Sequence, residues 1–435
     1  MSEQLLKAVQ DIWAAAPRCQ GLWSSPELVK VIDACGHHTE SKAALFGNNF
    51  AFINALKALG LPSYGSTASE PVDFESVTSQ LIAACTSTTQ IRTHYCPLDL
   101  ADDWPELAFG NAAVRSFTRA ELAIEFGAKK LAAHSVGADM DLDRLSMVQW
   151  LVVKEPYTVV GSPARRSGLF LEQPFEIDLG AVEPHQNEWP QVVQDALFFL
   201  LLAPWEDWVP YTQRNLFGFE IPWIHTVESD IFISPVAPPI PDKLSVYPHL
   251  YNDPEGNEYE RDRAEQIFLD AAATTDLVNW NSDSWQQLEQ AKTSPLFKTP
   301  IQHFLIRGFQ STGIDQLLAH ITVIEAAVGI GADYQRRLRT TYADLGATRR
   351  VGVRLAGLIG DAQAATQYAE LFDLRSAFVH GRADLKPISA LQRRCARSLA
   401  RRAACALVAN VESRETVLEK LLDVGADLLG VNVPR

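Results

Sequence analysis

The chain has 435 residues, of which 47% are hydrophobic and 21% charged, a balance typical of soluble globular proteins. Its length favours two or three domains, because a single hydrophobic core rarely grows this large. Acidic residues number 53 and basic residues 38, so the net charge of −15 argues against general polyanion binding by the whole surface. Any nucleic-acid site must therefore be local.

The first 60 residues predict helices, with breaks at Pro17, at Gly36 and at residues 60–62. The N-terminal segment has helical spacing and lacks the apolar core of a signal peptide. The longest strongly apolar run, residues 196–203, is much shorter than the roughly 20 residues that span a bilayer, and it predicts a buried segment instead. We therefore expect a cytoplasmic protein with no membrane partner.

The six cysteines are scattered without paired spacing, which suits a reducing compartment better than a disulfide framework. The residues that come closest to a metal-ligand set are Cys35, His37, His38, His94 and Cys96. Their spacing matches no zinc motif, so we expect neither a metal nor another cofactor.

The middle of the chain mixes helix and strand signals. Thr118 and Glu121 have the spacing of a capping box at the start of a helical pattern. Residues 148–160, 168–180 and 228–236 are rich in β-branched and aromatic residues and predict strands. The proline-rich residues that follow, up to Asp242, cannot continue a strand ladder and mark the predicted domain boundary.

Beyond about residue 255 strand signals largely disappear, and apolar residues recur at intervals of three and four. The sequence therefore predicts two domains. Residues 1–242 form an α+β companion domain with a sensor or regulatory role, and residues 255–435 form an all-α bundle.

A predicted helix from Ile314 onward has one continuous apolar face. That face comprises Ile314, Leu317, Leu318, Ile321, Ile324 and Val328. Glu325 falls near the middle of it, where a carboxylate must be paired or hydrogen-bonded. Arg354 and Arg375 on later helices are the expected partners, either in a structural ion pair or in a contact that positions an active-site arginine.

The segment LRSAFVHG, residues 374–381, places Arg375 five positions before His380. A step of five turns a regular helix by about 140°, so these two side chains would not share a face. Gly381 allows the helix to end in the left-handed conformation, which puts His380 in a deformable last turn. The pair is then either a functional site, completed by the reach of the arginine or by a second subunit, or a histidine that caps a helix.

A local basic surplus does exist in this region, because residues 331–402 contain fourteen Lys and Arg against six Asp and Glu. Four arginines project from one sector of a predicted helix: Arg393, Arg394, Arg397 and Arg401. Such a ridge suits an RNA phosphate backbone. It equally suits a solvated helix face or pairing with the acidic N-terminal half. Trp205 and Trp208, in contrast, are more typical of a core than of base stacking.

Three stretches of the C-terminal region resemble, in order, the HEPN superfamily and in particular its Apea-like group. Residues 317–329 resemble that group's helix with a glutamate near its end, and residues 350–360 resemble the helix that follows. Residues 371–381 resemble its signature of an arginine, four to six residues, a histidine and a glycine. The resemblance covers roughly residues 299–411. Residues 94–122 are similar, more weakly, to regions that precede such domains.

The resemblance implies a four-helix bundle that forms a homodimer and brings two Arg/His motifs into one cleft. Many members of the superfamily are metal-independent ribonucleases, and some serve in toxin or phage-defence systems, which would add an antitoxin or other protein partner. By motif position, Arg375 and His380 are the catalytic pair. Ser376 occupies a position where members often have a larger polar residue, so this sequence departs from the pattern there.

The chemistry of the two side chains suits RNA cleavage. A neutral imidazole accepts the proton of a ribose 2′-hydroxyl near neutral pH, and a guanidinium donates to the phosphate as charge develops. The product would be a 2′,3′-cyclic phosphate, and DNA would be spared because it lacks the hydroxyl. The supporting residues in this scheme are Glu325, Arg354, Asp373 and Ser376.

Two alternatives stay open at this point. The bundle is a noncatalytic module that binds RNA, a nucleotide or a protein, as Ser376 and the overall acidity favour. In the second alternative, the Arg375 and His380 pair only stabilises the bundle.

Overall fold

The computed structural model describes most of the chain. The described residues are 3–37, 42–65, 71–134, 140–159, 161–166, 188–210, 216–297, 300–334, 342, 345–381, 387–410 and 414–431. The chain contains both α-helices and antiparallel strands, and it divides into two compact units that interleave along the sequence. The first unit comprises Met1–Pro97, Ser116–Ala181 and Ile221–Ala264, and the second comprises Leu98–Arg115, Val182–Glu220 and Glu265–Arg435.

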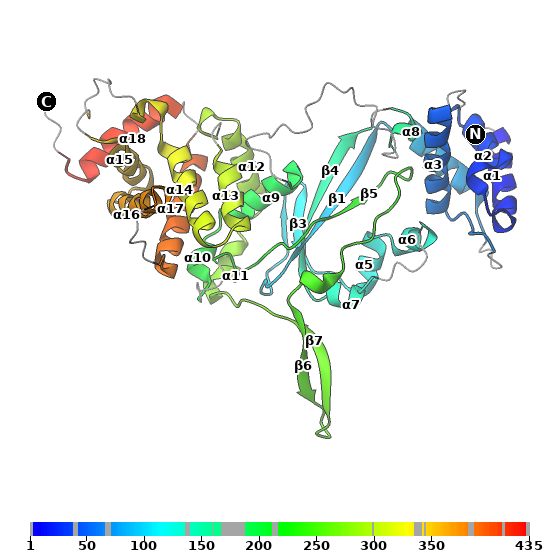
Figure 1. The fold of residues 1–435 in the computed structure, drawn as a ribbon, viewed down its shortest axis with the longest axis horizontal. Coiled ribbons are helices and arrows are strands. Elements are labelled where there is room, and N and C mark those ends of the chain that lie inside the picture. The colour runs from blue at the N-terminus through cyan, green and yellow to red at the C-terminus, as the bar shows by residue number, and fades with distance from the viewer. Residues whose placement is uncertain are drawn as a thin grey trace. The chain divides into compact units, whose positions relative to one another are not determined.

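The first unit begins with a layer of helices (Figure 1), in agreement with the helical prediction for the first 60 residues. Ser25 caps one of these helices and Asp73 caps another, each by accepting hydrogen bonds from backbone N–H groups of the first turn. Their apolar faces form a core that includes Phe52, Leu81 and Phe232. The elements are α1 Glu3–Ala15, η1 Ala16–Arg18, η2 Leu22–Ser24, α2 Pro26–Ala34, α3 Lys42–Ala58, α4 Phe74–Thr86 and α8 Pro163–Arg166.

Three neighbouring strands of this unit lie in the order β4, β1, β5. Alternation along the strands places Tyr95 and Trp150 on one face, where they pack against Phe117 and Phe126. The capping box of Thr118 predicted from the sequence is confirmed. The elements are β1 Thr89–Leu98, α5 Arg119–Glu125, α6 Ala128–His134, α7 Leu142–Leu145, β4 Gln149–Thr158, β5 His225–Glu228 and η3 Pro241–Lys243.

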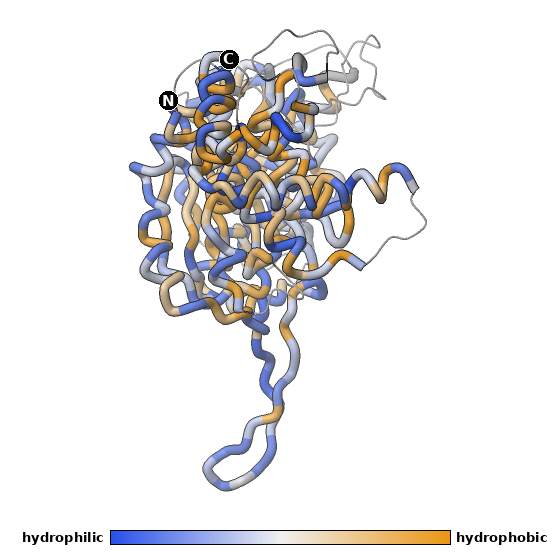
Figure 2. The backbone as a smooth tube through the Cα atoms, turned by 90° about the vertical axis from the view of Figure 1, so that its left-hand side faces the viewer, coloured by the Kyte–Doolittle hydropathy of each residue, from blue (hydrophilic) through white to orange (hydrophobic). Residues whose placement is uncertain are grey.

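A hairpin of β6 Val246–Asn252 and β7 Glu258–Ala264 completes the first unit. Figure 2 shows it as a largely hydrophilic arm. Its charged sequence hides the strand pattern, so the expectation that strand signals end near residue 255 was wrong. The strand predicted over residues 228–236 was also misplaced, because β5 ends where that prediction begins. The strand predicted over 148–160 is confirmed by β4, and the one over 168–180 lies outside the described residues.

The second unit is mainly helical. Helix α14 packs against α13 and α17, and α15 packs against α16 and α18. Helix α9 contains the strongly apolar run and is buried, as expected. The elements are β2 Leu107–Phe109, β3 Ala112–Arg115, α9 Gln191–Leu201, α10 Trp205–Trp208, α11 Ala271–Leu277, α12 Ser282–Lys292, η4 Pro295–Phe297, α13 Ile301–Gln310, α14 Gly313–Val328, η5 Gly331–Tyr334, α15 Ala347–Ile359, α16 Gln363–Val379, α17 Ala390–Val408 and α18 Arg414–Leu428.

The observed division differs from the expected one at residues 242–255. The hairpin of β2 and β3 belongs with the helical unit because Phe109 packs against Phe199 and Trp285. Helices α9 and α10 belong there because they contact α13 and α17, respectively. Among the described residues, no helix has both the length and the apolar character needed to cross a membrane.

Candidate functional site

The site begins with Glu325, near the C-terminal end of α14. The apolar face predicted for this helix is confirmed, since Leu317, Ile321, Ile324 and Val328 are fully buried. The Glu325 side chain is 17% exposed. Burial raises its pKa, while Arg375 and a hydrogen bond from Tyr368 oppose that rise. The bundle therefore holds this carboxylate against its desolvation cost with two polar partners.

Arg375 on α16 is the ion-pair partner of Glu325. Its Nη1 lies 3.5 Å from Glu325 Oε1, and its guanidinium lies 5.7 Å from the centre of the Phe372 ring. The Arg375 side chain remains 34% exposed. The predicted contact between Glu325 and Arg375 is thus confirmed, and the guanidinium is fixed on one side while solvent reaches the other.

Tyr368 was not identified from the sequence, although it lies seven residues before Arg375. Seven residues are almost two helical turns, so the two side chains share a face of α16. Tyr368 is 1% exposed, and its hydroxyl hydrogen-bonds to Glu325. The spacing itself was a usable signal, because a tyrosine on the face of an arginine that pairs with a buried carboxylate supplies a second donor.

Arg354 does not pair with Glu325, so that part of the prediction was wrong. Its guanidinium binds Asp333 through two contacts, from Nη1 to Oδ2 at 2.6 Å and from Nη2 to Oδ1 at 3.1 Å. It also donates to the Val328 carbonyl at 3.3 Å. Asp333 lies just beyond α14 and is buried, so it offers Arg354 a closer and more fully desolvated carboxylate than Glu325. Arg354 therefore secures the end of α14.

His380 is the C-cap residue of α16 and is exposed. Its backbone N–H donates to the Ser376 carbonyl at 3.0 Å, and Gly381 has a φ of +61°. The predicted helix end, with a left-handed glycine after His380, is confirmed. Ser376 is half-buried and Asp373 is exposed.

The described part of the chain contains no hydrogen bond or ion pair between Arg375 and His380. The guanidinium of Arg375 is held by Glu325, whereas His380 is at the exposed helix end beside Phe378 and Val379, which are 41% and 58% exposed. Within one chain the two groups are neighbours on α16 but do not converge. This matches the different helical directions expected from a step of five residues.

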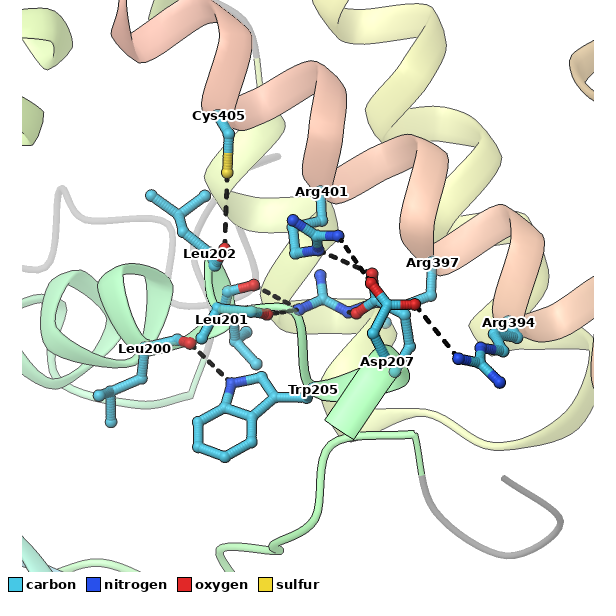
Figure 3. Close-up of polar contacts among 12 residues, drawn as sticks. Leu200, Leu201, Leu202, Trp205, Asp207, Arg394, Arg397, Arg401 and Cys405 are labelled. Atoms are coloured by element: carbon cyan, nitrogen blue, oxygen red, sulfur yellow. Dashed lines mark hydrogen bonds and ion pairs between the residues drawn. The ribbon is translucent and has the colours of Figure 1, made fainter. Parts of the chain in front are cut away.

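The predicted ridge of four exposed arginines is not present (Figure 3). Arg397 is fully buried and forms an ion pair with the equally buried Glu206, from Nε to Oε2 at 3.5 Å. It also donates to the Leu201 carbonyl. Burial lowers the pKa of Arg397 to about 10, and Glu206 opposes that change, so the guanidinium stays charged near neutral pH. Arg397 is an internal residue and is unavailable to RNA.

Two further arginines of α17 also pair with α10. Arg401 Nε lies 2.7 Å from Glu206 Oε1, and Arg401 Nη2 lies 3.3 Å from Asp207 Oδ2. Arg394 Nη2 lies 3.3 Å from Asp207 Oδ1. Arg393 is half-buried. Of the three interpretations of this surface, the structure therefore favours pairing with acidic residues earlier in the chain.

Trp205 and Trp208 flank these carboxylates and are buried, which confirms that they belong to a core. The indole N–H of Trp205 donates to the Leu200 carbonyl at 2.7 Å, as Figure 3 shows. The WEDW segment thus supplies two apolar side chains and the two carboxylates that receive α17.

The residues considered as a metal set are not gathered into one, and among the described residues no group of three or more suitable ligands is close enough to hold a metal. His94 hydrogen-bonds instead to Thr226 at 2.9 Å and to Glu155 at 3.3 Å. Cys96 is buried, and burial raises its pKa. His38 lies outside the described residues.

No protein-family model, curated protein or solved structure matches this chain. The functional argument therefore depends on the side chains at the end of α16.

Proposed function

We propose that the C-terminal bundle is a metal-independent RNA endonuclease of the HEPN type, with Arg375 and His380 as its catalytic pair. The observation that carries the proposal is the end of α16, where an exposed imidazole follows a half-exposed guanidinium fixed by Glu325. His380 accepts the proton of the ribose 2′-hydroxyl, and Arg375 donates to the phosphate oxygens.

A homodimer completes the site in this proposal, since Arg375 and His380 do not converge within one chain. Phe378 and Val379 lie beside His380 and expose apolar surface, which suits contact with a second copy. Arg375 of one subunit then faces His380 of the other across the cleft. A cytoplasmic toxin or phage-defence effector, restrained by an antitoxin or another protein, fits this activity by resemblance.

The direct test is cleavage of single-stranded RNA in the presence of a chelator by the parent protein, His380→Ala and Arg375→Ala. We expect each variant to lose at least about a hundredfold in rate, the lower range for removal of a general base or a positioned donor. Arg394→Ala is the matched control, because it removes a guanidinium of the same bundle that pairs with Asp207. Equal cleavage by parent and His380→Ala, or no cleavage by the parent, would contradict the proposal.

A second candidate is a noncatalytic binding module for RNA, a nucleotide or a protein. The ion pair between Glu325 and Arg375 favours it, because this carboxylate already offsets the charge that a phosphate would need. In that case Arg375→Ala leaves biological activity intact, and charge reversal of the exposed Arg394 alters partner binding.

A further inference from the structure

The end of α2 has a geometry that directs a histidine toward a cysteine. Gly36 adopts a φ of +78° directly after the C-cap residue Cys35. The Gly36 N–H donates to the Asp33 carbonyl at 2.9 Å, and the His37 N–H donates to the Ile32 carbonyl at 3.1 Å. These two bonds form a Schellman motif, which fixes the direction of the chain after the helix. His37 is thereby held next to the helix end.

Cys85, the penultimate residue of α4, lies at the same place. Its thiol and that of Cys35 are joined by a hydrogen bond, and the His37 side chain also hydrogen-bonds to Cys85. Both cysteines are half-buried and pack against the core of the helical layer. Two thiols from different helices are thus in contact while remaining accessible to small molecules.

The charges around the pair favour a thiolate on Cys85. Its pKa is lowered, chiefly by the hydrogen bond with Cys35 and then by His37 and the positive charge of Arg166, although burial opposes the change. Arg166 is held in place by the Ala84 carbonyl at 2.8 Å and by Asp230 at 3.7 Å. The pKa of Cys35 is raised, first by the same hydrogen bond and then by burial.

We propose that Cys35 and Cys85 form a redox-active dithiol that hydroperoxides convert into a disulfide, with Cys85 as the attacking group. The Cys85 thiolate attacks one oxygen of hydrogen peroxide, the O–O bond breaks, and hydroxide leaves, so that Cys85 becomes a sulfenic acid. The Cys35 sulfur then attacks the Cys85 sulfur, the S–O bond breaks, and the hydroxyl leaves as water with the Cys35 proton. Two sulfurs are oxidised and one peroxide is reduced, and a dithiol reverses the reaction by exchange.

The other cysteines provide internal controls. Burial raises the pKa of both Cys96 and Cys405, which disfavours their thiolates. Cys19 is half-exposed like Cys85 and lies in the same helical layer, so it controls for access. We therefore expect iodoacetamide at pH 7 to label Cys85 roughly tenfold faster than Cys19, since the thiolate is the nucleophile.

The experiment is peptide mapping of the full chain by mass spectrometry under non-reducing conditions, after brief exposure of the reduced protein to hydrogen peroxide. The expected main product is the peptide pair linked through Cys35 and Cys85, and dithiothreitol removes it. Cys35→Ser leaves a sulfenic acid on Cys85 that dimedone traps, whereas Cys85→Ser gives neither product. His37→Ala slows alkylation of Cys85 severalfold, which a merely structural contact would not do.

Two results would overturn the proposal. One is the absence of the linked peptide, with oxidation spread evenly over the cysteines. The other is alkylation of Cys85 no faster than that of Cys19. Neither depends on RNA cleavage, so this site stands or fails separately from Arg375 and His380.

Discussion

Glu325 illustrates how a single buried carboxylate links stability to the candidate site. Its folded-state pKa is raised above the ordinary value of 4.5, so the folded protein binds more protons than the unfolded chain in that range. The contribution of Glu325 to stability is therefore greatest at acidic pH and falls as the pH rises through the folded-state pKa. The bundle accepts this cost and gains a fixed Arg375.

Glu325→Gln should reveal that cost. Glutamine keeps an acceptor for Tyr368 but carries no charge, so we expect its unfolding free energy at pH 7.5 to equal or exceed that of the parent by up to about 1 kcal/mol. The advantage should shrink toward pH 5. Glu325→Ala, which leaves the Tyr368 hydroxyl without its acceptor, should lose about 1–3 kcal/mol. Urea unfolding at several pH values measures both, and a glutamine variant less stable than the parent at every pH contradicts this account.

His320 is a second buried titratable residue in the bundle. It is fully buried, and neither ring nitrogen has a hydrogen-bond partner among the described residues. Burial, and then the charge of Arg397, places the pKa of His320 well below 6.5. Because the unfolded chain binds a proton that the folded protein does not, this residue costs stability as the pH falls below 6.5.

We expect His320 to cost about 1.4 kcal/mol at pH 5.5 relative to neutral pH, from the proton uptake of one histidine on unfolding. His320→Leu should remove this part of the acid destabilisation, as measured by urea unfolding at pH 7.5 and 5.5. His249→Leu, a substitution of an exposed histidine in β6, is the control. If His320→Leu loses as much stability between the two pH values as the parent does, the assignment is wrong.

At the scale of elements, α17 is attached to α10 by buried charge. Arg397 and Glu206 are both fully buried, so neither has water to replace a lost partner. Removing one member of such a pair leaves an uncompensated buried charge. An exposed pair on the same two helices, between Arg394 and Asp207, is stabilised far less because water solvates both groups.

Arg397→Ala should therefore lower the unfolding free energy by about 3–5 kcal/mol, whereas Arg394→Ala should change it by at most about 1 kcal/mol. Thermal or urea unfolding of the two variants beside the parent measures the difference. Similar small effects from both substitutions would show that Arg397 is not held as the structure describes.

At the scale of the whole molecule, local patterns predicted local structure well. The apolar face of α14, the capping box at Thr118 and the left-handed Gly381 each depend on near neighbours, and each was predictable. The burial of Arg397 was not, because an arginine on a polar helix face has the same pattern whether it meets water or Glu206, nearly 200 residues away.

The interleaving of the two units was unpredictable for the same reason. Residues 98–115 and 182–220 join the helical unit through packing of side chains such as Phe109 and Phe199, which no local period encodes. The candidate site was predictable in part. The pairing of Glu325 with Arg375 follows from helix periodicity and charge, whereas the preference of Arg354 for Asp333 depends on the path of the chain after α14.

The central claim is that Arg375 and His380 cleave RNA through its 2′-hydroxyl, and the end group of the product tests it most directly. Two strands of identical sequence, one RNA and one with a 2′-deoxyribose at the cleaved position, are incubated in chelator with the parent and with His380→Ala, and the products are examined by mass spectrometry. The account predicts a 2′,3′-cyclic phosphate from the RNA with the parent only, and no cleavage at the deoxyribose. An intact RNA, or the same products from His380→Ala, would contradict it.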